Sequence, residues 1–361
     1  MIKKATGKIL ILQAFSWALL ACAWRISGFA DWWAAHVFKW WTAVAGSVFG
    51  IFPFSVAEFL LYALIVWMVG SLCIAFRQAF ICRRMRQGVL SHFLLVASVL
   101  WFLFVTCSGI NYQRTSFAES TGMVEEEYTL TELKGTSLWL TQKVNEYAAL
   151  VERDEDGMMC LSLSQAETGQ LAAEVMEALG DTYPLLSGSY PSPKPVAFSR
   201  ILSLLGLTGV YSPLTIEANY NREMTAYNIP VTMCHELSHL KGFMQEQEAN
   251  FIAFLACEQS ESADFCYSGY MLAWIHCTNA LYDASRTDYS QVRALLCEEA
   301  VVDLTANSVF WNSNDGALAE VSTQVNDTYL KVNGQSSGVL SYEEVVGLLV
   351  TYWMNNYAEI N

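Results

Sequence analysis

Two histidines and a glutamate in the stretch 231–250 stand at the spacing of a metal site. His235, Glu236 and His239 follow one another in the order His-Glu-x-x-His. Residues four apart lie on one face of an α-helix, so both imidazoles can reach a single ion. Glu236 lies about 100° round the helix, where its carboxylate can take a proton from a water beside the ion. The pattern predicts a hydrolytic zinc site with Glu236 as the general base; a helix that carries two histidines by chance is the alternative.

A third ligand is expected, because a hydrolytic zinc site usually has three protein ligands and one open position. Two acids, Glu246 and Glu248, follow closely. In one unbroken helix, a rise of about 1.5 Å per residue would place His235 and Glu246 roughly 16 Å apart. We therefore expect the first helix to end at Gly242, a residue typical of helix C-termini, and a second helix over Met244–Glu258.

Only one of the two acids can face the ion, because side chains two residues apart on a helix point about 200° away from each other. Glu246 shares its face with small residues that permit close helix approach, namely Ala249, Asn250, Ala253 and Cys257. Glu248 shares its face with the larger residues Phe251, Ile252 and Leu255, which indicate packing. We predict Glu246 as the third ligand, with Glu248 as the alternative.

The sequence HELSHLKGF followed by EQEANFIAFLAC resembles the DUF3810 family of bacterial membrane proteins. Gly209–Asn221 and Gly338–Trp353 resemble the same family, so the resemblance covers nearly the whole chain. More distantly, the chain is similar to gluzincin-type zinc peptidases, whose second metal helix carries Glu-x-x-Ala-Asp or Glu-x-x-Ala-Asn. Glu246, Ala249 and Asn250 match that motif. The resemblance implies the same third ligand, and a role for Asn250 in orienting a ligand by a hydrogen bond.

The first third of the chain has the composition of a membrane domain. The protein is 53% hydrophobic and only 15% charged, whereas charged residues make up about a quarter of a soluble protein. Three apolar stretches can cross a hydrocarbon core of about 30 Å: Ala5–Ile26, Phe54–Phe76 and Val89–Ile110. The first could instead be a signal peptide, and Leu19–Cys22 partly resembles a lipoprotein cleavage site; an anchor helix is preferred because no soluble sequence follows it. We predict a multi-pass protein of the cell membrane, with the lipid bilayer as a partner.

The positive residues predict how the chain crosses the membrane. They are Lys3, Lys4 and Lys8 before the first span, and Arg77, Arg83, Arg84 and Arg86 between the second and third. Such residues favour the cytoplasmic side. Residues after Ile110 are therefore expected outside the cytoplasm.

The loop Phe29–Pro53 between the first two spans is rich in tryptophan. Trp32, Trp33, Trp40 and Trp41 lie seven or eight residues apart, which indicates one helical stripe. Because tryptophan prefers the headgroup region, we predict an interfacial helix. A weakly hydrophobic fourth span is the alternative.

Charge separates the two parts of the chain. Residues 1–115 carry 10 Lys+Arg and 2 Asp+Glu, and the remainder carries 10 Lys+Arg and 33 Asp+Glu. The acidic part has no basic patch, which excludes nucleic acid as a partner. It holds six cysteines, which could form three disulfides or remain buried thiols: Cys160, Cys234, Cys257, Cys266, Cys277 and Cys297.

Residues 116–361 are expected to form a zincin-like α+β domain, so that the whole chain is mainly α with a small edge sheet. Apolar spacing predicts helices at 131–151, 164–179 (ended by Gly180), 265–282 and 340–357. Two strands, Lys194–Ser199 and Val210–Tyr220, are predicted before the metal helix, which Pro230 begins. The free edge of the second strand could bind an extended peptide.

Four further residues are candidates for substrate or transition-state contacts. His276 could steady a developing oxyanion, and Tyr211 is a comparable candidate. Glu217 and Asn219 lie on one side of the second strand. For each of the four, a purely structural role is the alternative.

Taken together, these residues predict a membrane-anchored zinc metallopeptidase that cleaves a peptide or protein substrate. One alternative is a zinc hydrolase of a non-protein envelope amide. Another is a non-catalytic sensor or scaffold with a structural metal. Glu236 argues against the sensor or scaffold, because a structural metal site needs no base and prefers a fourth protein ligand.

Overall fold

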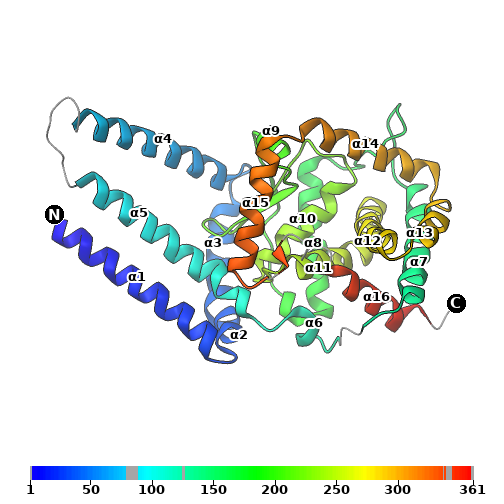
Figure 1. Cartoon of the computed structure of the whole chain (residues 1–361), viewed down its shortest axis with the longest axis horizontal. Coiled ribbons are helices and arrows are strands. Elements are labelled where there is room, and N and C mark those ends of the chain that lie inside the picture. Colours follow the sequence, from blue (N-terminus) through cyan, green and yellow to red (C-terminus); the bar gives the residue numbers. More distant parts are fainter. Residues whose placement is uncertain (1, 79–87, 124–126, 336, 339–343, 359–361) are drawn as a thin grey trace. The chain divides into compact units, whose positions relative to one another are not determined.

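The computed structural model describes residues 2–78, 88–123, 127–335, 337–338 and 344–358 and is mainly helical (Figure 1). Arg83, Arg84 and Arg86 of the predicted cytoplasmic loop lie outside the described residues, as do residues 339–343 of the tail. The chain divides into two compact units. The first is Met1–Thr115 with Ser212–Glu217, and the second is Ser116–Tyr211 with Ala218–Asn361.

The first unit contains the three predicted membrane spans. Its long helices are α1 (Ile2–Arg25), α4 (Val56–Phe76) and α5 (Gly88–Phe104). The segments Thr6–Arg25, Val56–Phe76 and Leu90–Gln113 are long and apolar enough to cross a membrane, which agrees with the prediction of a membrane protein. Aromatic contacts join these helices, with ring centroids 5.3 Å apart for Trp17 and Trp101 and 4.9 Å apart for Trp67 and Phe93.

The tryptophan-rich loop is helical, but its four tryptophans do not share one face. It comprises α2 (Phe29–Trp33), the π-helical turn η1 (Ala34–Phe38) and α3 (Lys39–Gly50). The wider π turn shifts the helical phase. Trp40 therefore does not fall on the face of Trp33. Trp33 donates its indole N–H to the Thr106 carbonyl at 3.1 Å, whereas Trp32, Trp40 and Trp41 are exposed. The prediction of a single stripe is wrong for Trp33. The unit closes with the turns η3 (Val105–Gly109) and η4 (Asn111–Gln113).

The second unit is a helical assembly with a small sheet. Its helices are α6 (Phe117–Ser120), α7 (Leu130–Ala148), α8 (Gln165–Thr182), η5 (Pro184–Leu186), α9 (Ser199–Leu204), α10 (Asn228–Leu240), α11 (Glu246–Glu258), α12 (Ala263–Ala284), α13 (Arg286–Arg293), α14 (Glu298–Asn314), α15 (Ala317–Val332) and α16 (Val345–Asn356). Helices α10 and α11 are almost wholly buried and pack against each other and against α8 and α12 (Figure 1). The two central helices therefore form the core of this unit.

Two local predictions in this unit are wrong. Helix α8 does not end at Gly180 but runs on to Thr182. A Cβ at Gly180 would lie 2.8 Å from the Ser187 Cα, so this glycine permits a close backbone approach. The predicted strand Lys194–Ser199 is reduced to β1 (Lys194–Pro195), because Ser199 already begins α9.

The predicted strand Val210–Tyr220 is instead a hairpin of β2 (Gly209–Ser212) and β3 (Glu217–Tyr220). The sheet order is β1-β3-β2, with β1 parallel to β3, so β3 is the central strand and is fully buried. The chain reverses at Ile216, whose φ of 54° is left-handed. The Ser-Pro pair 212–213 is the turn signal that the apolar pattern concealed.

All cysteines that the structure describes are free thiols. Of the two readings of the six cysteines after residue 115, the structure shows the free-thiol one. Cys234, Cys257, Cys266 and Cys277 are buried among the core helices, where they pack as small apolar side chains.

Candidate metal centre

The end of α10 places the two histidines beside the start of α11. Helix α10 ends at Leu240, and Gly242 has a φ of 89°, in the left-handed region where glycine carries no steric penalty. The amide of Gly242 donates to the His239 carbonyl at 2.9 Å, and the amide of Phe243 donates to the Ser238 carbonyl at 3.4 Å. This pair of bonds is the Schellman motif. The predicted turn at Gly242 is therefore present, and it returns the chain so that Glu246 begins α11.

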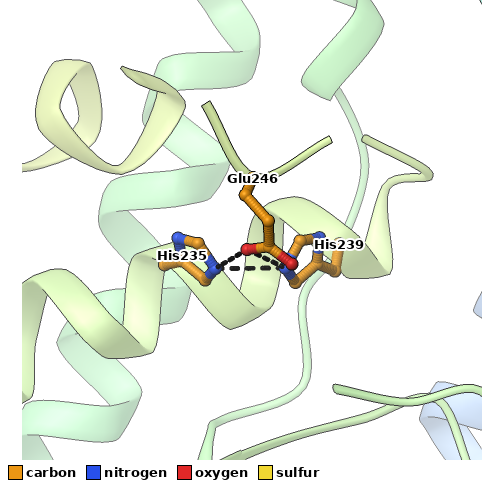
Figure 2. Close-up of side chains that lie close together, drawn as sticks. All are labelled: His235, His239 and Glu246. Atoms are coloured by element: carbon orange, nitrogen blue, oxygen red, sulfur yellow. Dashed lines mark hydrogen bonds and ion pairs between the residues drawn. The ribbon is translucent and has the colours of Figure 1, made fainter. Parts of the chain in front are cut away.

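Three side chains from the two helices point toward one another (Figure 2). One carboxylate oxygen of Glu246 lies 3.1 Å from Nε2 of His235 and 3.7 Å from Nε2 of His239. The two Nε2 atoms are 3.1 Å apart. Glu248 faces elsewhere, and its carboxylate accepts a hydrogen bond from the backbone amide of Phe117. The structure thus brings His235, His239 and Glu246 together and leaves Glu248 outside the cluster.

The orientation of both imidazoles suits a metal ion. Nδ1 of His235 lies 2.8 Å from Oδ1 of Asn250, and Nδ1 of His239 lies 2.7 Å from the Phe243 carbonyl oxygen. Carbonyl oxygens only accept, so each Nδ1 donates a proton and each Nε2 is turned toward Glu246, where it can bind a metal. In a tetrahedral zinc site with bonds of about 2.0–2.1 Å, ligand atoms lie about 3.3 Å from one another. The observed separations of 3.1, 3.1 and 3.7 Å are close to that value, so the donor set fits zinc.

Without a metal, the cluster holds a proton on His239 beside the Glu246 carboxylate. Burial lowers the pKa of His239, but the charge of Glu246 and its hydrogen bond, together with the charge of Glu236 and the bond to the Phe243 carbonyl, raise the pKa to about 9. Burial raises the pKa of the Glu246 carboxyl, but His239 and His235 hold that pKa well below the usual range. The metal-free cluster is therefore an ion pair between His239 and Glu246.

Glu236 lies beside this cluster with one oxygen unsatisfied. Its side chain is 4% exposed, and its Oε2 is buried without a hydrogen-bond partner in the described structure. Burial raises the pKa of Glu236 to about 7, although the charges of His235 and His239 act to lower it. A buried polar atom without a partner is costly. A water placed between this oxygen and the cluster would satisfy it.

Strand β2 packs directly against the carboxylate of Glu236. A Cβ on Gly209 would collide with that carboxylate, and it would also lie 2.9 Å from the Asn219 carbonyl oxygen. Only a residue without a side chain fits there. Sequence reasoning did not single out Gly209 or the Phe243 carbonyl. A glycine at the start of a strand is a signal of close approach that could have identified the first.

Two of the four further candidates lie near the cluster. The ring centroid of Tyr211, on β2, is 6.2 Å from that of His239. His276, on α12, has its pKa lowered to about 4, first by burial and then by the charge of His235. His276 is therefore a neutral imidazole within electrostatic range of the cluster.

The other two candidates make scaffold hydrogen bonds. Asn219 donates its side-chain amide to the Val210 carbonyl at 3.3 Å, across the hairpin. Glu217 accepts hydrogen bonds from the backbone amides of Val56 at 3.0 Å and Ala57 at 2.8 Å. Both oxygens of Glu217 are thus engaged at the first turn of α4.

A comparison with family models places the chain as a whole. The model of DUF3810, described as a protein of unknown function, matches residues 33–350. The chain belongs to the DUF3810 family. No curated protein and no solved structure matches it. Functional conclusions about this DUF3810 protein therefore depend on the geometry of its own site.

Proposed function

We propose that this DUF3810 protein is a membrane-anchored zinc metallopeptidase with a zincin-like catalytic domain. The observation that carries the proposal is the buried, unpartnered Oε2 of Glu236 beside the converging ligand atoms of His235, His239 and Glu246. A purely structural zinc site prefers a fourth protein ligand and needs no base. Three ligands with an adjacent unsatisfied carboxylate suit hydrolysis better.

Each residue of the centre has a defined task in this proposal. His235, His239 and Glu246 would hold the zinc, while Asn250 and the Phe243 carbonyl keep the imidazoles oriented. When bound there, zinc would provide a Lewis acid for the substrate carbonyl and for the attacking water. Glu236 takes the proton from the attacking water and passes it to the leaving amine. In the metal-free centre, burial raises the pKa of this carboxyl to about 7.

The surroundings favour an extended peptide as the substrate. Strand β2 lies at an edge of the sheet, and Gly209 on the same strand contacts the base. An edge strand offers backbone N–H and C=O groups to which an extended chain can bind by strand addition. Tyr211, on β2, and His276, on α12, are the candidates for steadying the oxyanion that forms on the substrate carbonyl.

The membrane spans bear on where this chemistry takes place. Lys8 and Arg77 stand at the ends of α1 and α4 that the Lys/Arg bias assigns to the cytoplasm. We place the catalytic domain outside the cytoplasm, at the cell membrane. The substrate would then be an extracytoplasmic peptide or protein, and the acidic surface offers nothing to nucleic acid.

Metal analysis and digestion of a peptide library by the full chain in detergent test the proposal. We expect about one zinc per chain and cleavage that a chelator abolishes. Glu236→Gln should retain the zinc and lower kcat by about 10²–10⁴-fold, because only the proton acceptor is lost. Glu261→Gln, an exposed control, should change neither.

Two results would contradict this function. Full turnover by the Glu236→Gln variant would show that Glu236 is not the base. Cleavage of amide-linked envelope fragments, with no cleavage of any peptide, would replace the peptidase by a different zinc hydrolase. If the chain binds no zinc, both the zinc peptidase and the other zinc hydrolase are excluded.

A further inference from the structure

The Phe243 carbonyl, which orients His239, stands in a turn that its own backbone holds weakly. Its oxygen lies 2.7 Å from Nδ1 of His239. The amide of Phe243 reaches the Ser238 carbonyl only at 3.4 Å, beyond the usual length of an N–H···O bond. Its neighbour Gly242, with a φ of 89°, is the residue type with the greatest conformational freedom. Something besides the backbone is therefore needed to fix where this carbonyl points.

The side chain of Phe243 is buried against that of Phe117, in α6. Phe243 is 1% exposed, and Phe117 has no exposed surface. Their ring centroids are 5.4 Å apart and the ring planes meet at 86°, which is the edge-to-face arrangement that aromatic pairs favour. A side chain in a close-packed interior has little room to move. The position of Phe243, and with it the direction of its carbonyl, therefore depends on Phe117.

Phe117 is itself fixed by contacts that do not involve Phe243. Its ring centroid lies 5.2 Å from that of Tyr183 and 6.3 Å from that of Phe251. Its backbone amide donates to the carboxylate of Glu248 on α11, and hydrogen bonds to a charged acceptor are stronger than neutral ones. All of these residues belong to the second unit. Phe117 can thus serve as a fixed support for Phe243.

The contacts of Phe117 lie on both sides of a ligand along the chain. Its ring meets Phe243, which precedes Glu246, and its amide binds Glu248, which follows it. Phe117 stands 131 residues before Glu248 in the sequence, so only the fold brings it there. A metal site works when its ligands are held to within about 0.5 Å. A support that touches the ligand segment at two points meets this requirement.

We propose that Phe117 is a positioning residue of the candidate metal centre: by supporting the ring of Phe243, it keeps the Phe243 carbonyl on Nδ1 of His239. The proposal relies on the proposed function only for the identity of the ion as zinc. It assigns a task to an apolar side chain that contacts neither the ligands nor the base.

Amide hydrogen exchange of the full chain in detergent, with a chelator present, tests this support without any metal. Phe117→Leu keeps an apolar side chain and the backbone bond to Glu248, but it removes the ring that meets Phe243. We expect the amides of Gly242 and Phe243 to exchange about tenfold faster or more. Phe265→Leu is the matched control, since Phe265 is a phenylalanine of α12 that is 1% exposed. It should leave both amides unchanged, even where it lowers the melting temperature.

Zinc titration against a competing chelator tests whether Phe117 acts through Phe243. Phe117→Leu should lower zinc affinity about tenfold or more, which is the effect of losing a hydrogen bond to a ligand, and Phe265→Leu should not. Phe243→Leu keeps the carbonyl but removes the ring that Phe117 supports. Because the two residues act in series, Phe117→Leu should cost little further affinity in a chain that already carries Phe243→Leu.

The outcomes separate positioning from a general contribution to the core. Equal acceleration of the Gly242 and Phe243 amides by Phe117→Leu and Phe265→Leu would overturn the proposal, and so would additive losses of zinc affinity in the double variant. If Phe117→Leu does not fold, Phe117→Met, whose flexible side chain fills irregular space, is measured in the same way. If the parent protein binds no zinc, the proposed function fails while the exchange data still decide the role of Phe117.

Discussion

Glu246 and Glu248 stand two residues apart on α11, yet their carboxylates have different partners. Glu246 faces His235 and His239, whereas Glu248 accepts the backbone amide of Phe117. The helical offset of about 200° between them is the cause. One acid therefore faces the candidate metal centre, and the other holds the segment that opens the second unit.

Exchanging each acid for its amide should separate these two tasks. Glu246→Gln should weaken zinc binding by more than the roughly 10–100-fold typical of losing a hydrogen bond to a ligand. Glu248→Gln should leave zinc binding intact but lower the free energy of unfolding by about 1–3 kcal/mol, because a charged acceptor of a buried amide is lost. Zinc titration against a competing chelator and thermal unfolding measure the two effects. Equal loss of zinc affinity in both variants would contradict the assignment.

Zinc affinity should depend on pH through His239. Its pKa is raised to about 9 by Glu246 despite burial, so zinc must displace a proton at neutral pH. We expect the apparent affinity to rise about tenfold per pH unit from about pH 6.5 to 9. An affinity that is independent of pH in this range would show that His239 is not a protonated ligand.

The free energy of unfolding of the metal-free protein should fall as the pH rises, whereas zinc affinity should increase. The pKa of His239 in the folded chain lies above its ordinary value of 6.5. The stabilisation by the His239–Glu246 pair is therefore fully present below pH 6.5 and is lost as the pH rises through 9. Unfolding of the chelated full chain at several pH values checks this sign.

At the scale of the element, the turn between α10 and α11 makes the centre possible. The two helices supply the ligands from either side of Gly242, and the Schellman bonds to His239 and Ser238 define the angle of return. Helix α10 alone would offer two ligands, and helix α11 alone would offer one. The candidate metal centre is thus a property of the helix pair.

Gly242→Ala should disturb this pair. A φ of 89° is strained for any residue with a side chain, and we expect a loss of about 1 kcal/mol or more in the free energy of unfolding, with weaker zinc binding. Gly316→Ala is the control, because its φ of 171° is extended and no atom lies within 4 Å of an added Cβ. Thermal unfolding and zinc titration would contradict the expectation if both variants behaved alike.

At the scale of the whole molecule, the chain joins an apolar membrane unit to an acidic unit that contains the candidate centre. The first 115 residues carry 10 Lys+Arg against 2 Asp+Glu, and the balance is reversed beyond them. Positive residues near membrane spans stay on the cytoplasmic side. With an odd number of spans, we expect the second unit on the opposite side of the membrane.

A topology reporter tests this arrangement. Fusion after Asn111 should report an extracytoplasmic position, and fusion after Arg77 should report a cytoplasmic one. A cytoplasmic signal at Asn111 would contradict both the orientation and the number of spans.

The sequence alone determined the features that depend on neighbours along the chain. The length of the apolar runs identifies three helices that are long and apolar enough to cross a membrane. The four-residue spacing of His235 and His239 places them on one helical face, and Gly242 marks the end of that helix. These features hold because helix periodicity and glycine conformation are local properties.

Tertiary structure decided what depends on residues far apart. Periodicity hid the reversal at Ile216, because an apolar turn that is buried against another segment resembles a continuous strand. Nothing local to Glu217 indicates that its carboxylate binds amides 160 and 161 residues earlier in the chain. The approach of Gly209 to Glu236 likewise exists only once strand and helix are packed. Such contacts are chosen by the packing of the whole chain, since the free energy of burying a charge or a bare backbone depends on what the fold places opposite it.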